Sequence, residues 1–241
     1  MEMKFHPHLP FPKLVRAGAL ILAALLPATA PAAVLVKFPF SDSTAPSSGL
    51  SYTTFDSAVL ASATVTAGPG LGRLAVDPDS WSAGMPVLET APNSSTTSSA
   101  ANALANNWYF QFTLTPNSGM DIRSIEADWS RGGTSGVRGW FVRSSADNYA
   151  SNLYANETPD GTATGLQHAS FNVSGNTGLS SATTYRFYIY TSSTGRYMDF
   201  QNVQFNSHSL PSSVPEAAAA STVWLWSGAL LGLMLYRGRR Q

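Results

Sequence analysis

The middle of the chain alternates apolar and polar residues with a period of two. The clearest run covers residues 108–114, where the large apolar positions are Trp108, Phe110, Phe112 and Leu114. Tyr109, Gln111 and Thr113 occupy the positions between them. Successive side chains of a β-strand point to opposite faces, so this run predicts a strand with one strongly apolar face.

Similar short runs recur between clusters of Gly, Asn, Asp, Ser and Pro, and none has a convincing helical period. They cover residues 34–38, 58–66, 124–129, 137–143, 166–173, 185–190 and 198–205. The last run has an irregularity that indicates a β-bulge near Gln201-Asn202. Residues 90–106 are polar and low in complexity, and they predict a loop. We therefore expect residues 34–210 to form one all-β domain, a two-sheet antiparallel sandwich with jelly-roll-like wiring. An immunoglobulin-like sandwich is the alternative.

The first 33 residues have the pattern of a signal peptide. Lys4, Lys13 and Arg16 precede an unbroken apolar run at 17–26, and small residues follow at 28–33. This order is typical of an export signal that signal peptidase removes. We expect the mature chain to begin at Ala33 or Val34.

The tail at 211–241 has a second apolar segment. Residues 217–236 carry no formal charge, and Arg237, Arg239 and Arg240 follow within five positions. A helix of this length reaches ~30 Å, which is enough for one bilayer crossing. Positive residues stay on the cytoplasmic side, so the pattern predicts a transmembrane helix with the C-terminus inside and the domain outside.

Val214-Pro215-Glu216, the apolar run and the arginine cluster together resemble the PEP-CTERM sorting signal of exported bacterial proteins. The resemblance implies recognition by an exosortase, a membrane-embedded enzyme that cuts near the Pro-Glu motif. Ala217 stands where that family usually has a second proline. Residues 108–206 also resemble a jelly-roll-like module found in PEP-CTERM proteins, a module with no assigned activity. The implied location is the cell envelope, the cell surface or the extracellular matrix.

Composition excludes several function classes. The chain has no cysteine, which excludes disulfides, a thiolate zinc site and a cysteine nucleophile. Residues 34–214 hold eight basic and twelve acidic side chains, giving a net charge of −4. The exported part therefore lacks the basic excess that nucleic-acid binding requires.

Aromatic residues supply one candidate binding site. Trp140, Tyr188 and Tyr190 lie in predicted strands and, on an outward face, could stack on sugar rings. The alternative is that they belong to the core between the sheets. If exposed, they would make the domain a carbohydrate-binding module whose partner is an exopolysaccharide.

Acidic residues supply weaker candidates. Glu126 and Asp128 share one face of a predicted strand about 6.6 Å apart, a separation compatible with inverting glycoside hydrolysis. That pair, Asp77 with Asp79, or Asp160 could also contribute oxygen ligands to Ca²⁺. The two histidines of the exported part, His168 and His208, are too few for a zinc site. We predict no required cofactor and no catalytic residue.

The leading hypothesis is a non-enzymatic exported surface protein, sorted through Val214, Pro215 and Glu216 and held by the arginines at 237, 239 and 240. A carbohydrate-binding module is the first alternative and a glycoside hydrolase the second.

Overall fold

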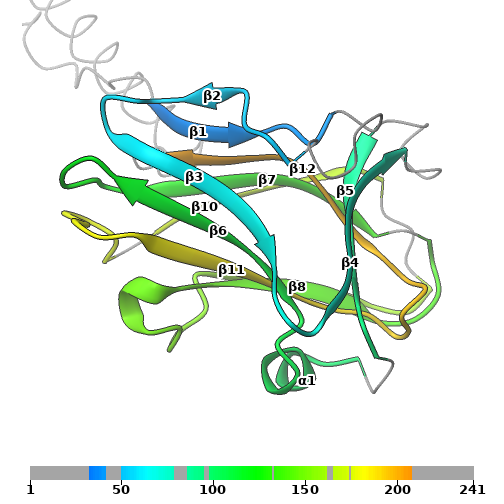
Figure 1. Cartoon of the computed structure of the whole chain (residues 1–241). Helices are drawn as coiled ribbons and strands as arrows, with labels where there is room; N and C mark the ends of the chain where they lie inside the picture. The colour runs from blue at the N-terminus through cyan, green and yellow to red at the C-terminus, as the bar shows by residue number, and fades with distance from the viewer. Residues whose placement is uncertain are drawn as a thin grey trace, which may run out of the picture. The chain divides into compact units, whose positions relative to one another are not determined.

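The computed structural model describes residues 33–41, 50–78, 86–94, 98–131, 133–161, 165–173 and 175–207. These residues form two antiparallel β-sheets packed face to face (Figure 1). The expectation of an all-β, two-sheet sandwich is therefore confirmed.

The larger sheet has seven strands centred on β12. Along its main path the order is β10 (Gln167–Asn172), β7 (Ser124–Arg131), β12 (Met198–Asn206), β1 (Val34–Phe38) and β2 (Thr54–Phe55). Two further strands, β4 (Leu71–Pro78) and β5 (Pro86–Pro92), extend it beside the first half of β12. One edge of β12 is thus shared between β5 and β1.

The smaller sheet has five strands in the order β3 (Leu60–Ala67), β6 (Tyr109–Pro116), β11 (Thr183–Tyr190), β8 (Arg138–Ser144) and β9 (Tyr154–Thr158). A short helix, α1 (Ala100–Ala105), and one turn of 3₁₀ helix, Ser145–Asp147, complete the described elements.

The core lies between the two sheets and is rich in aromatic rings. Phe112 of β6 contacts Phe205 of β12, with ring centroids 5.2 Å apart. Phe187 of β11 contacts Phe110 at 5.1 Å and stacks on Trp140 at 5.8 Å. All five rings are fully buried. The period-two pattern therefore identifies the inward residues of β6 and β11, because alternation aims every second side chain at the other sheet.

A bulge interrupts β12 where the sequence predicts one. The register between β12 and β7 shifts between Gln201 and Gln204, and Asn202 adopts a positive φ of 49°. Phe200 and Val203 are three positions apart and would point to opposite faces of a regular strand. The extra residue in the bulge brings both to the same face, so Phe200, Val203 and Phe205 all face the core.

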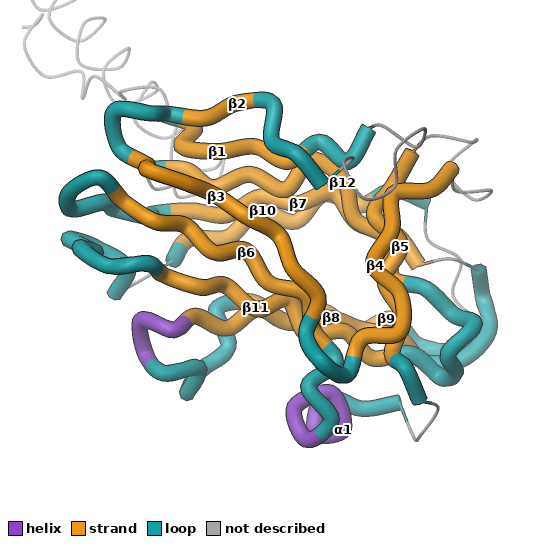
Figure 2. The backbone as a smooth tube through the Cα atoms, in the orientation of Figure 1, coloured by secondary structure: helices purple, strands orange, loops and turns teal. Residues whose placement is uncertain are grey.

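The prediction of a loop over 90–106 is wrong in part. Strand β5 continues to Pro92, and α1 begins after Ser99, whose side chain accepts a hydrogen bond from the Asn102 amide. Helix α1 packs against β11 and β8 of the smaller sheet and lies below these strands in Figure 2. Trp108 packs under this helix, in a cluster separate from the main core, so it does not share the inward face of Phe110.

The two ends of the described domain lie side by side in the larger sheet. Val34 pairs with Asn206, and the Ser207 amide donates a hydrogen bond to the carbonyl of Ala33 at 3.0 Å. The predicted signal peptide up to residue 32 and the tail from residue 208 lie outside the described residues. Within the described part, no helix is long and apolar enough to cross a bilayer.

Candidate functional site

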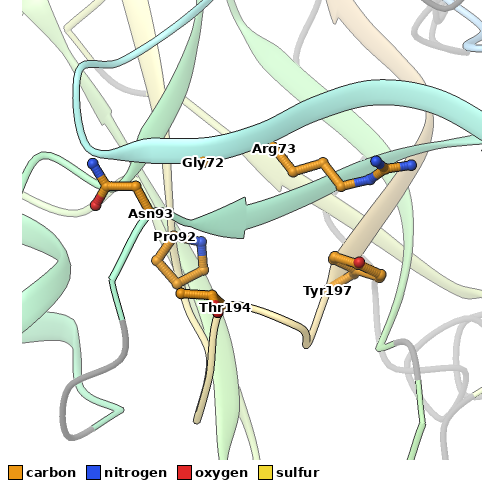
Figure 3. Close-up of a pocket in the computed structure, with 6 residues that line it drawn as sticks. All are labelled: Gly72, Arg73, Pro92, Asn93, Thr194 and Tyr197. Atoms are coloured by element: carbon orange, nitrogen blue, oxygen red, sulfur yellow. The ribbon is translucent and has the colours of Figure 1, made fainter.

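An open pocket lies where β4 begins, β5 ends and the β11–β12 loop passes. It has a volume of about 370 Å³. Its lining residues are Gly72, Arg73, Pro92, Asn93, Thr194 and Tyr197 (Figure 3). This volume falls at the lower end of the range of small-ligand sites, which is ~300–1,000 Å³.

Strand pairing brings these three segments together. The start of β4 pairs with the end of β5, Leu71 facing Pro92, and β5 in turn pairs with the start of β12, which follows Tyr197. Gly72 allows the close approach of the next strand. A Cβ atom at Gly72 would lie 2.8 Å from Cα of Asn93, so a side chain there would push that residue away.

Arg73 is held by two carboxylates. Its Nε donates to Oε2 of Glu89 at 2.6 Å, and its Nη2 contacts Oδ2 of Asp77. Partial burial alone would lower the pKa of Arg73. The hydrogen bond to Glu89 and the charges of Glu89, Tyr197 and Asp77 outweigh that effect, so the pKa is raised. The guanidinium is therefore fixed in position and protonated, and the two carboxylates balance its positive charge.

Tyr197 is half-buried, and its ring lies below the Arg73 side chain (Figure 3). The guanidinium carbon of Arg73 lies 5.4 Å from the ring centroid, within the range of a cation–π contact. The carbonyl of Tyr197 accepts a hydrogen bond from Nη1 of Arg138 at 2.7 Å. Arg73 and Arg138 thus position this residue from its ring and from its backbone.

Arg138 is fully buried, and within the part of the chain that the structure describes its Nε and Nη2 have no hydrogen-bond partner. Burial, together with the positive charges of Arg131 and Arg196, lowers the pKa of Arg138 to about 10, while Asp199 acts in the opposite direction. Arg131 donates to the carbonyls of Gly133, Thr134, Gly136 and Pro159. The two buried guanidinium groups therefore hold the β7–β8 loop, Pro159 and the backbone of the pocket residue Tyr197.

Asn93 and Thr194 add uncharged polar side chains to the pocket lining. The Asn93 amide donates to the Pro69 carbonyl at 3.4 Å, and Asn93 and Thr194 are both exposed. Amide and hydroxyl groups can both donate and accept hydrogen bonds. Beside a tyrosine ring, they suit a ligand that combines hydroxyl groups with an apolar face.

The prediction that Trp140, Tyr188 and Tyr190 present rings to a sugar is wrong. Trp140 is fully buried between the sheets, while Tyr188 and Tyr190 are 3% and 4% exposed on the outer face of the smaller sheet. Helix α1 packs over those two tyrosines. The Tyr190 hydroxyl also donates to Oε2 of Glu157, and burial is the largest cause of its raised pKa.

Glu126 and Asp128 lie on the outward face of β7, as predicted, and outside the pocket. The side-chain amide of Asn206 donates to Glu126 at 2.8 Å, and that of Asn202 donates to Asp128 at 2.8 Å. Nδ1 of His168, on the neighbouring strand β10, lies 2.8 Å from Oδ1 of Asp128. The structure thus joins the acidic pair to one of the two candidate histidines in a surface network.

The other calcium candidates have protein partners. Asp77 binds Arg73, and Oδ1 of Asp160 accepts hydrogen bonds from the amides of Gly161 and Gly136. Among the described residues, no group of three or more His, Asp or Glu side chains could hold a metal ion. The remaining candidates lie outside the described residues: Asp79, His208, Val214, Pro215, Glu216, Arg237, Arg239 and Arg240.

Sequence reasoning missed the pocket residues. Arg73 follows a glycine-rich turn and Tyr197 follows the polar run 191–196, but more than 120 positions separate them. A sequence signal for Arg73 is its spacing of four positions from Asp77. Opposite charges at that spacing pair on a helix, whereas here they pair along strand β4.

Comparisons with known proteins give only distant likenesses. No family model matches the chain, and no curated protein matches it. Among solved structures, an arabinose-bound MgGH51 α-L-arabinofuranosidase is 15% identical, with a TM-score of 0.40. The match covers 72% of this chain but only 26% of the arabinofuranosidase.

Two smaller domains are matched over nearly their whole length. The CBM22-1 xylan-binding domain of Xyn10C from Paenibacillus barcinonensis is 13% identical, with a TM-score of 0.38, over 74% of this chain and 97% of that domain. A family 29 carbohydrate-binding module is 10% identical, with a TM-score of 0.37, over 75% and 92%. These scores record a loose likeness and carry no argument about function.

Proposed function

We propose that the domain binds carbohydrate through the pocket at Tyr197 and acts as a non-enzymatic module of an exported surface protein. The observation that supports this most is the combination of one held tyrosine ring with amide, hydroxyl and guanidinium groups around an open cavity. Sugar rings expose apolar C–H faces and hydroxyl groups, so they can stack on the ring and bond to its polar neighbours. Glu126 and Asp128 lie outside the pocket, and the proposal includes no hydrolysis.

The pocket is suited to a polymer because it is open. Asn93 and Thr194 are exposed at its rim, so a chain of sugar units could extend beyond the unit that meets Tyr197. Arg73 and Tyr197 are already held in place, so binding would cost little side-chain entropy. An exopolysaccharide is the ligand that this surface and the predicted export suggest.

Tyr197→Ala tests the proposal. Removing the ring should weaken binding to a soluble polysaccharide about tenfold or more, because a ring contact is lost together with one wall of the pocket. Binding should be measured by isothermal titration calorimetry against a panel of soluble polysaccharides. Thermal unfolding of the variant shows whether the domain remains folded.

Tyr52→Ala is the matched control. Tyr52 is 41% exposed and stacks on Phe55, away from the pocket-lining residues. Its removal should leave polysaccharide binding within about twofold of the parent. If the parent chain binds no member of the panel, or if Tyr52→Ala weakens binding as much as Tyr197→Ala, the proposed site is wrong.

Export and sorting form the second part of the proposal. The apolar run at 17–26 and the tail at 214–240 support them, and both lie outside the described residues. When the chain is expressed in a bacterium with an exosortase, mass spectrometry of the mature protein should find an N-terminus at Ala33 or Val34 and a C-terminus near Glu216. Recovery of an intact C-terminus from that host would refute sorting, and an intact N-terminus would refute export.

A further inference from the structure

We infer, resting on the proposed function, that the pocket accepts neutral sugar units and rejects acidic ones such as uronates. The observation behind this inference is that the pocket's arginine is already neutralised by the protein. Among the described lining residues, Arg73 is the one charged side chain.

A ligand at the pocket would meet a negatively charged group. Arg73 donates from Nε to Glu89 at 2.6 Å and contacts Asp77 through Nη2. Two carboxylates thus share one guanidinium, which leaves this group with a net charge of −1. A ligand carboxylate arriving here would face two negative charges together with one positive charge.

The neighbouring arginines add no free positive charge. Arg131 and Arg138 are fully buried, and burial and the charge of Arg196 lower the pKa of both. The Arg196 guanidinium contacts the Ser135 hydroxyl, which is not a lining group. Counting Asp77, Glu89, Asp160 and Asp199 against the four arginines leaves no positive excess to attract an anion.

Uncharged groups of the pocket can recognise a neutral sugar. The amide of Asn93 and the hydroxyls of Thr194 and Tyr197 line the pocket, and each can pair with a sugar hydroxyl. Such pairing needs no compensating charge on the ligand. Salt screens interactions between charges. Affinity that comes from hydrogen bonds to hydroxyl groups and from ring contact should therefore depend only weakly on the salt concentration.

The experiment compares the full-length chain and its Glu89→Gln variant. The probes are neutral xylan and glucomannan, and acidic polygalacturonate and alginate, titrated at 50 and 500 mM NaCl. For the parent we expect binding to at least one neutral polymer, with less than about a twofold change in Kd between the two salt concentrations. We expect at least tenfold weaker binding to both acidic polymers.

Glu89→Gln should raise affinity for polygalacturonate at least threefold at 50 mM NaCl and lose that gain at 500 mM. Asp77→Asn should also raise the affinity for polygalacturonate. Because Asp77 is more exposed than Glu89, this variant replaces Glu89→Gln in the experiment if Glu89→Gln does not fold. Glu126→Gln, the same change outside the pocket, should leave the preference unaltered.

The outcomes separate this inference from the proposed function. Salt-sensitive binding of the parent to an acidic polymer, lost in Tyr197→Ala, would overturn the neutral preference and leave carbohydrate binding intact. No gain for polygalacturonate in either folded acid variant would also overturn it. Absence of binding to all four polymers and to the wider panel would overturn both.

Discussion

At the scale of residues, single polar side chains fix the loops that connect the strands. Asp121 is an example at the β6–β7 connection. Its Oδ1 accepts a hydrogen bond from the Gly178 amide at 2.7 Å, and its Oδ2 pairs with Arg123 at 2.8 Å. One carboxylate thereby ties this connection to the loop before β11.

The pKa of Asp121 predicts a change of stability in acid. The hydrogen bond from Gly178 and the pairing with Arg123 lower this pKa below the usual value of an aspartate. The unfolded chain therefore binds a proton at higher pH than the folded chain does. The stability that Asp121 contributes is present above about pH 4 and is lost as the pH falls through the folded-state value.

Asp121→Asn should remove this dependence. At neutral pH the variant should be less stable by less than about 1 kcal/mol, because the pair is exposed. Between pH 4 and pH 2 its free energy of unfolding should fall less steeply than that of the parent. Urea unfolding at several pH values measures both slopes, and equal slopes would contradict the assignment.

At the scale of elements, the β3–β4 turn is built for close contact. The Gly70 amide donates to the Asn107 carbonyl at 3.2 Å, and the Gly70 carbonyl accepts from Asn93 at 2.9 Å. A Cβ atom at Gly70 would lie 1.9 Å from the carbonyl oxygen of Asn106. The turn therefore contacts both the end of α1 and the rim of the pocket.

Gly70→Ala should destabilise the domain by about 1–3 kcal/mol, because backbone atoms must move to admit the methyl group. Gly165→Ala is the control, since a Cβ atom there meets nothing within 4 Å. Thermal unfolding should show a lower midpoint for Gly70→Ala and little change for Gly165→Ala. Equal midpoints for Gly70→Ala and the parent would show that the turn adapts at little cost.

Most strands that are rich in large apolar residues could be predicted from sequence, including β8, which is buried on both faces. Strands β2, β4, β5 and β9 could not. Strands β6, β7 and β11 alternate clearly, and all three are where the pattern places them. Strand β5 buries residues on both faces, and β9 is mostly polar with one buried position, so neither alternates in hydrophobicity. Helix α1 has an N-cap signal at Ser99 that its Ser-rich, low-complexity surroundings obscured.

At the scale of the whole molecule, the pocket could not be predicted because no local pattern contains it. Its residues come from three segments that meet only through the β4–β5 and β5–β12 pairings. Strands β4 and β5 were not predicted from the sequence. Their contact with the loop that carries Tyr197 could therefore not be predicted either. The sugar-stacking residues chosen from sequence were wrong because aromatic content alone does not distinguish a surface ring from one beneath α1, as for Tyr188 and Tyr190, or between the sheets, as for Trp140.

The pairing of β1 with β12 has a mechanical consequence. Val34 lies opposite Asn206, so the first and last residues of the domain sit at the same end of one antiparallel pair. A pulling force applied between these residues would peel the strands apart one hydrogen bond after another, whereas shear would load the bonds together. If the domain is attached to a surface at one end only, no force acts between Val34 and Asn206. Strands β1 and β12 then stay paired when liquid flows past the domain.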